Sequence, residues 1–94
     1  MENNKNNNRE DITNINIGIA TQELLNKLKY RLEQKGYHSF ASTHEILGII
    51  TEEYHELVDA QKSNNISEIR HELLDVAVAC LFGVACIEQN SIDW

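Results

Sequence analysis

Apolar residues spaced three and four positions apart predict a first helix over about Thr21 to Lys35. Leu24, Leu25, Leu28 and Leu32 fall on one stripe of such a helix. Gly36 follows, and glycine readily adopts the left-handed conformation that ends many helices. The chain begins with a polar, asparagine-rich run that buries too little apolar surface to offset its loss of entropy. We therefore expect residues 1–18 to form a disordered tail and residues 19–94 to form one helical domain.

Two further helices are predicted, and each has a recognisable N-cap. Ser42 and Glu45 form a capping-box pattern at the start of a helix that should run to about Lys62. Ser63-Asn64-Asn65 makes the turn, and Asn65 with Glu68 caps a third helix that should reach about Gln89. The chain has no proline and no alternating apolar pattern of strand type outside the tail. We expect an all-α bundle of three helices per chain.

The second half of the third helix is apolar on every face. The stretch Val76 to Ile87 is twelve residues long, whereas a membrane span needs about 20. It is therefore expected to be a core helix that must be covered all round. Two partner helices seldom provide that cover, and a chain of 94 residues gains much from association. We expect a homodimer or homotetramer in which third helices pack into a four-helix core.

Charge and cysteine content narrow the possible partners. Eight basic residues against 15 acidic ones give a net charge of −7, which disfavours a protein that binds nucleic acid. Cys80 and Cys86 lie six positions apart in the third helix, so a rise of roughly 9 Å separates their Cα atoms and prevents a disulfide between them. Free cysteines and the lack of a cleavable signal sequence lead us to expect a cytoplasmic protein.

Acidic residues interrupt the apolar face of the second helix. Glu53 lies in the middle of the stripe and Glu56 lies at its edge, one turn later; the stripe itself consists of Ile46, Ile49, Ile50, Leu57 and Ala60. A carboxylate at the centre of an apolar face costs several kcal/mol unless a cation or strong donors satisfy it. Glu53 therefore needs a compensating group.

The third helix repeats this pattern with Glu72 and Asp75, three positions apart on the side continued by apolar residues. If the second and third helices run antiparallel across their short turn, both acidic pairs face one another. Four ionised carboxylates in one small volume require a cation. Mg²⁺, or Mn²⁺ in its place, prefers such oxygen ligands and is often shared with substrate phosphates. The simpler alternative is that these acids form ordinary solvated helix faces.

The same acids carry a family resemblance. Glu53 and Glu56, followed after fifteen residues by Glu72 and Asp75, resemble the E-x-x-E then E-x-x-D signature of the MazG-like all-α nucleotide pyrophosphohydrolases. Glu52 completes the frequent E-E-x-x-E form, and the approach from Phe40 is also similar. The resemblance implies hydrolysis of a nucleoside triphosphate to monophosphate and pyrophosphate, with Mg²⁺ bound by those four residues. Glu53 would then be catalytic as well, and Glu52 is a weaker candidate for orienting or deprotonating water.

Basic residues and a histidine are candidates for binding the nucleotide. Lys27 and Arg31 lie beside the leucine stripe of the first helix and could reach a triphosphate, although a solvated basic face is the simpler explanation. His44, in the first turn of the second helix, could also contact a ligand or remain a surface side chain. Arg70 could instead form an internal ion pair. All three substrate contacts are therefore open to a plainer explanation.

Two rival functions remain. Glu52 with His55 and Glu68 with His71 both form the Glu-x-x-His unit of ferritin-like di-iron bundles. However, we expect His55 to face water and Glu68 to take part in the N-terminal cap of the third helix. The other rival is a catalytically silent MazG-like module that senses nucleotides or drives oligomerisation, because no basic residue follows Asp75.

Overall fold

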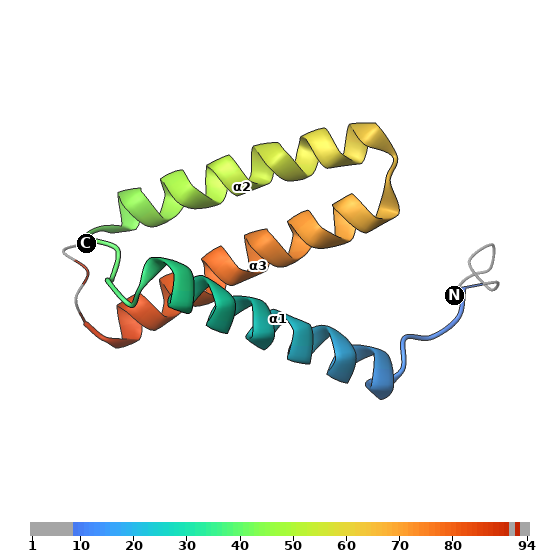
Figure 1. Cartoon of the computed structure of the whole chain (residues 1–94), viewed down its shortest axis with the longest axis horizontal. Coiled ribbons are helices and arrows are strands. Elements are labelled where there is room, and N and C mark those ends of the chain that lie inside the picture. Colours follow the sequence, from blue (N-terminus) through green and yellow to red (C-terminus); the bar gives the residue numbers. More distant parts are fainter. Residues whose placement is uncertain (1–8, 91, 93–94) are drawn as a thin grey trace, which may run out of the picture.

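The computed structural model describes residues 9–90 and 92, and these form three helices without any strand. Helix α1 spans Asn14–Lys35, α2 spans Thr43–Ser63 and α3 spans Ile66–Glu88. Helices α2 and α3 form an antiparallel hairpin, and α1 crosses α3 (Figure 1). The expected all-α architecture is therefore confirmed for the described part of the chain.

Side-chain caps define the ends of the helices where the sequence predicted them. The Ser42 hydroxyl accepts a bond of 3.2 Å from the Glu45 amide, and the Asn65 side chain accepts bonds from the amides of Ser67 and Glu68. Glu45 accepts from the Ala41 amide at 2.6 Å, one residue before the position expected for a capping box. Gly36 ends α1 with a φ of 87°. Glycine adopts this positive φ without the steric penalty that a Cβ would bring. The predicted boundaries after the first helix are thus correct to within a residue.

The start of α1 is the main correction to the predicted fold. The helix begins at Asn14 rather than near Thr21, so residues 14–18 of the expected tail are helical. Thr13 and Asn16 form a reciprocal capping box in which asparagine replaces the usual Glu or Gln. This local hydrogen bonding starts the helix without help from burial, since every residue from 14 to 22 is exposed. Residues 1–8 of the expected tail lie outside the described residues.

The core is concentrated around the second half of α3. Val78, Ala79, Gly83 and Cys86 are the buried residues of that helix. A Cβ at Gly83 would lie 3.0 Å from a methyl carbon of Ile46, so the glycine permits α2 and α3 to approach closely. Phe40, buried in the loop before α2, packs edge to face on Phe82 with 5.1 Å between ring centroids. These contacts fix the relative positions of the two hairpin helices.

One face of the hairpin is apolar and exposed. It consists of Leu47 and Tyr54 from α2 and Ile66, Leu73, Val84 and Ile87 from α3, which are 53 to 77% exposed. At 100° per residue, the α3 members lie on a different side of the helix from Leu74 and Val78, which line the cleft beside α1. We call these six residues the open hairpin face. A single chain therefore leaves α3 partly uncovered, as its sequence predicted.

No helix in the described residues combines the length and apolar character needed to cross a bilayer. This agrees with the interpretation of Val76 to Ile87 as a core segment.

Candidate functional site

Four acidic side chains from α2 and α3 lie close together in the hairpin. Oxygen atoms of Glu53, Glu56 and Glu72 all lie within 4.8 Å of one another. Asp75 joins them through Glu72, because ligand atoms of His71, Glu72 and Asp75 also lie within 4.8 Å of one another. We call Glu53, Glu56, Glu72 and Asp75 the acidic cluster. The antiparallel hairpin thus brings together the two acidic pairs that the sequence singled out.

Two oxygen atoms of this cluster lack a partner within the described structure. Glu53 Oε1 and Glu72 Oε1 are buried, and neither accepts a hydrogen bond there. A buried carboxylate oxygen without a donor is destabilising by an amount comparable to a lost hydrogen bond or more. A divalent cation with a preference for oxygen ligands would satisfy both atoms. The residues present therefore fit a hard divalent ion.

The electrostatics of the cluster are consistent with this unmet need. Burial raises the pKa of Glu53, and repulsion from Glu56, Asp75 and Glu72 raises it further. Burial also raises the pKa of Glu72, with added repulsion from Asp75 and Glu56. Both shifts mean that the ionised form is disfavoured when no cation is bound.

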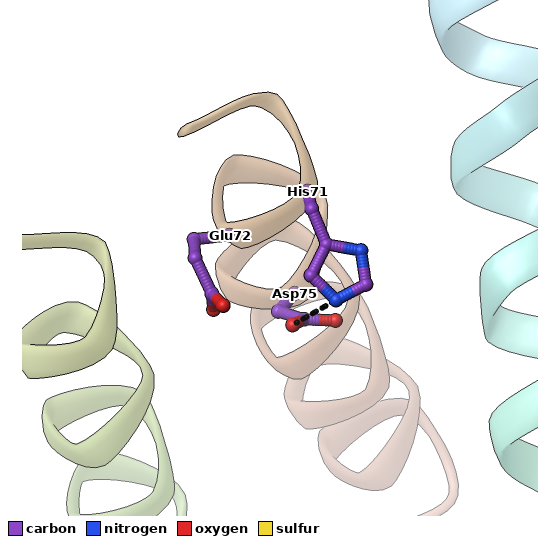
Figure 2. A group of neighbouring side chains, drawn as sticks. All are labelled: His71, Glu72 and Asp75. Atoms are coloured by element: carbon purple, nitrogen blue, oxygen red, sulfur yellow. Dashed lines mark ion pairs between the residues drawn. The ribbon is translucent and has the colours of Figure 1, made fainter. Parts of the chain in front are cut away.

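Asp75 differs from the other three acids because protein groups already satisfy it. Lys27 of α1 forms an ion pair of 2.9 Å with Asp75 Oδ1, and His71 Nε2 lies 3.4 Å from Asp75 Oδ2. The Lys27 ammonium also lies 2.9 Å from His71 Nδ1. Figure 2 shows Glu72 on the side of α3 that faces α2, and His71 on the side that faces α1, with Asp75 between them. Asp75 therefore links the acidic cluster to α1.

A cleft of about 860 Å³ lies between α1 and the hairpin. Glu53, Glu56 and Asp75 line it, and so do the basic residues Lys27, Arg31, Lys35 and Arg70. Arg31 also lies over the Phe82 ring at 5.7 Å from its centroid, which orients its side chain. One cleft thus combines carboxylates for a cation with basic groups for an anion.

Arg70 is held by a second helix. Its guanidinium donates two hydrogen bonds, of 2.8 and 2.6 Å, to the Glu23 carboxylate of α1. This bidentate pair lowers the pKa of Glu23 and raises that of Arg70. Arg70 is thus the internal ion-pair partner that the sequence allowed it to be.

Several sequence candidates lie apart from this cleft. Glu52 and His44 are exposed and belong neither to the residues that line the cleft nor to the groups of possible ligands. For His44 the reason is distance along the helix, because nine residues separate it from Glu53, which is about 13 Å of helical rise. Glu52 projects from a different face of α2 than Glu53. The structure therefore gives neither residue a place beside the acidic cluster.

The di-iron alternative also loses its geometric basis. His55 is exposed and outside both groups of possible ligands. Glu68 accepts a hydrogen bond from the Ser63 hydroxyl at the turn. The two Glu-x-x-His units therefore do not converge on one metal position within the described residues.

His71 has structural neighbours that differ from those suggested by the sequence. The sequence pairs it with Glu68 in a Glu-x-x-His unit, whereas its neighbours are Asp75, one turn later in α3, and Lys27 of α1. The spacing of four between His71 and Asp75 was visible in the sequence and places both on one helix face. The contact with Lys27 was not visible, because 44 residues separate the two positions.

Comparison with protein-family models, with curated proteins and with solved structures yields no match. The likeness to MazG-like proteins therefore rests on the acidic spacing in the sequence.

Proposed function

We propose that this chain is a Mg²⁺-dependent nucleoside triphosphate pyrophosphohydrolase of the MazG-like kind. The observation that carries the proposal is the pair of buried, unpartnered oxygens of Glu53 and Glu72 within the acidic cluster. Glu56 and Asp75 complete the proposed ligand set, with Mn²⁺ as a possible substitute. When bound, the ion would polarise a phosphate and make water a better nucleophile.

The basic wall of the cleft supports a phosphorylated substrate. Lys27 and Arg31 belong to the same cleft as Glu53 and Asp75, so a triphosphate bound there would contact these cations and the metal ion that the carboxylates would hold. Water would be added across the α–β phosphoanhydride, giving a nucleoside monophosphate and pyrophosphate. Catalysis of this type depends mainly on positioning and electrostatic stabilisation.

The hydrolase proposal is tested by pyrophosphate release from a panel of canonical, deoxy and modified nucleoside triphosphates. We expect release with Mg²⁺ from at least one nucleotide, and a loss of about 100-fold or more on Glu53→Gln or Glu72→Gln. Glu88→Gln is the matched control, because Glu88 is an exposed acid at the far end of α3. Equal rates for all three variants would refute a role for the acidic cluster.

A catalytically silent relative is the second candidate. The exposed position of Glu52 outside the cleft favours it, because Glu52 is then not placed to orient or deprotonate water at the cluster. This candidate predicts that nucleotide binds in the presence of Mg²⁺ while no pyrophosphate is released by the wild-type protein. The same panel therefore separates the two candidates.

We also propose that a second copy of the chain covers the open hairpin face. Leu73, Val84 and Ile87 lie within an arc of about 60° on α3, and Leu47 and Tyr54 extend the surface over α2. Two copies related by a two-fold axis would bury the same residues from both sides and form a four-helix core. Both cysteines are free, which fits the cytoplasmic location we propose.

The dimer is tested by sedimentation or light scattering of a variant with Leu73→Lys and Ile87→Lys. We expect this variant to be monomeric at concentrations where the wild type is dimeric, since two buried charges per copy would lack partners. Ile15→Lys is the control, because Ile15 is 75% exposed on α1. Dissociation by the control alone would place the interface on α1 and contradict the proposal.

A further inference from the structure

Lys27 lies beside one member of the acidic cluster and beside His71. Its ammonium lies 2.9 Å from Asp75 Oδ1 and 2.9 Å from His71 Nδ1. Asp75 is one of the proposed cation ligands, so an ammonium ion of the protein already neutralises a carboxylate that the cation would need. Lys27 and Asp75 are 22% and 25% exposed, which leaves their pair partly accessible from the cleft.

A lysine and a divalent cation cannot both neutralise Asp75 to the full extent. The cation carries twice the charge and can also bind the other acids of the cluster, so it should take over the Asp75 oxygen when it binds. Lys27 would then lose its carboxylate partner while remaining in the wall of a cleft that also contains Arg31 and Lys35. An ammonium on a flexible stem can turn towards a phosphate in that cleft.

Arg70 provides a contrast within the same pair of helices. Its guanidinium is bound by both oxygens of Glu23, and Glu23 is not a member of the acidic cluster. Cation binding would therefore leave the Arg70–Glu23 pair intact. Of these two links between α1 and α3, the one through Lys27 involves a proposed metal ligand.

We propose that Lys27 is an exchangeable counterion, which neutralises Asp75 in the metal-free protein and transfers to a phosphate of the substrate when a divalent cation binds. This inference rests on the proposed function, and it assigns Lys27 a role in coupling cation binding to polyphosphate binding. The coupling must be reciprocal: each ligand raises the affinity for the other. Metal-free protein would hold Lys27 away from the substrate position.

The exchange is tested by calorimetric titration with Mn²⁺ alone, and then with inorganic tripolyphosphate in the presence of saturating Mn²⁺. For Lys27→Met we expect Mn²⁺ alone to bind about three- to fivefold more tightly, because a competing cation is gone. Tripolyphosphate should bind about tenfold more weakly, because a charge-assisted contact is lost. Lys29→Met is the matched control, since it removes one charge from an exposed position of α1 outside the cleft.

Opposite signs in the two titrations support the exchange, because a purely structural role for Lys27 would weaken both. The inference is overturned if Lys27→Met leaves both affinities unchanged, weakens both, or behaves like Lys29→Met. Lys27→Arg, which keeps the charge, should restore tripolyphosphate binding and shows whether the Met variant merely fails to fold. If neither wild type nor variant binds Mn²⁺, the proposed metal centre fails as well. If binding follows the expected pattern but no nucleotide is hydrolysed, only the proposed hydrolysis fails.

Discussion

The two halves of α3 are stabilised in different ways. The second half contains all the buried residues of the helix and packs closely against α2 at Gly83 and Ile46. The first half carries Glu72 and Asp75, is linked to α1 by ion pairs, and leaves the Glu72 Oε1 atom without a hydrogen-bond partner. Apolar packing therefore stabilises one end of the hairpin, while the other end retains buried carboxylate oxygens that lack a hydrogen-bond partner in the described structure. The acidic cluster therefore lies at the end of the hairpin where α3 has no buried residues.

The largest effect is expected from the packed end. Phe40→Ala removes the ring that packs on Phe82 and should lower the free energy of unfolding by about 3–4 kcal/mol. Urea denaturation at one fixed protein concentration measures this change, because dimer formation makes stability depend on concentration. Tyr37→Ala, at a position 78% exposed in the same loop, should change it by less than about 0.5 kcal/mol. Similar losses for both variants would mean that the packed end does not dominate stability.

A smaller, pH-dependent effect is expected from the acidic end. The pKa values of Glu53 and Glu72 are raised above their ordinary value of 4.5, so above that pH the folded state binds more protons than the unfolded state. The stability of the metal-free protein should therefore fall as pH rises from 4.5 through the raised pKa values. Arg70 lowers the pKa of Glu23, so the contribution of Glu23 to stability is lost as the pH falls below this range.

Melting temperatures measured with a chelator across this pH range test the acidic end. We expect the melting temperature of the wild type to decrease as the pH rises through this range. Glu53→Gln should flatten the pH profile, and Mg²⁺ should raise the melting temperature of the wild type more at the upper end of the range. A wild-type profile that rises with pH above 4.5 would show that the acidic cluster does not destabilise the metal-free fold.

The smallest effect is expected from the Arg70–Glu23 ion pair. Both side chains are largely exposed, at 55% and 41%, and exposed pairs of this kind contribute little to stability. Arg70→Gln should therefore lower the midpoint of urea denaturation only slightly, and the change should shrink further at high salt. A loss as large as that of Phe40→Ala would mean that α1 is essential to the hairpin, and the contrast between the two halves would not hold.

Local signals in the sequence predicted much of this structure. Ser42, Asn65 and Gly36 cap helices through contacts with residues at most one or two helical turns away. Their roles at helix ends could therefore be predicted from the neighbouring sequence. The convergence of Glu53 with Glu72 was also predictable, because a short turn leaves an antiparallel hairpin as the natural arrangement.

Contacts made by α1 were not predictable in the same way. The pairing of Lys27 with Asp75 depends on the angle and position at which α1 crosses α3, and no periodic pattern within one helix encodes them. The early start of α1 was missed because Asn16, a residue typical of loops, takes the role of Glu or Gln in the capping box with Thr13. Composition alone suggested disorder where a local hydrogen-bonding motif starts a helix.

Gly83 has a consequence for the acidic end that its own surroundings do not suggest. The hairpin is fixed at one end by the turn at Asn64, which has a φ of 61°, and at the other by the close approach of Gly83 to Ile46. Glu53 and Glu72 lie along the hairpin between these two fixed points. These two points therefore set the gap between the carboxylates, and a methyl group added at Gly83 should change the size of cation that fits the proposed metal site without altering any proposed ligand.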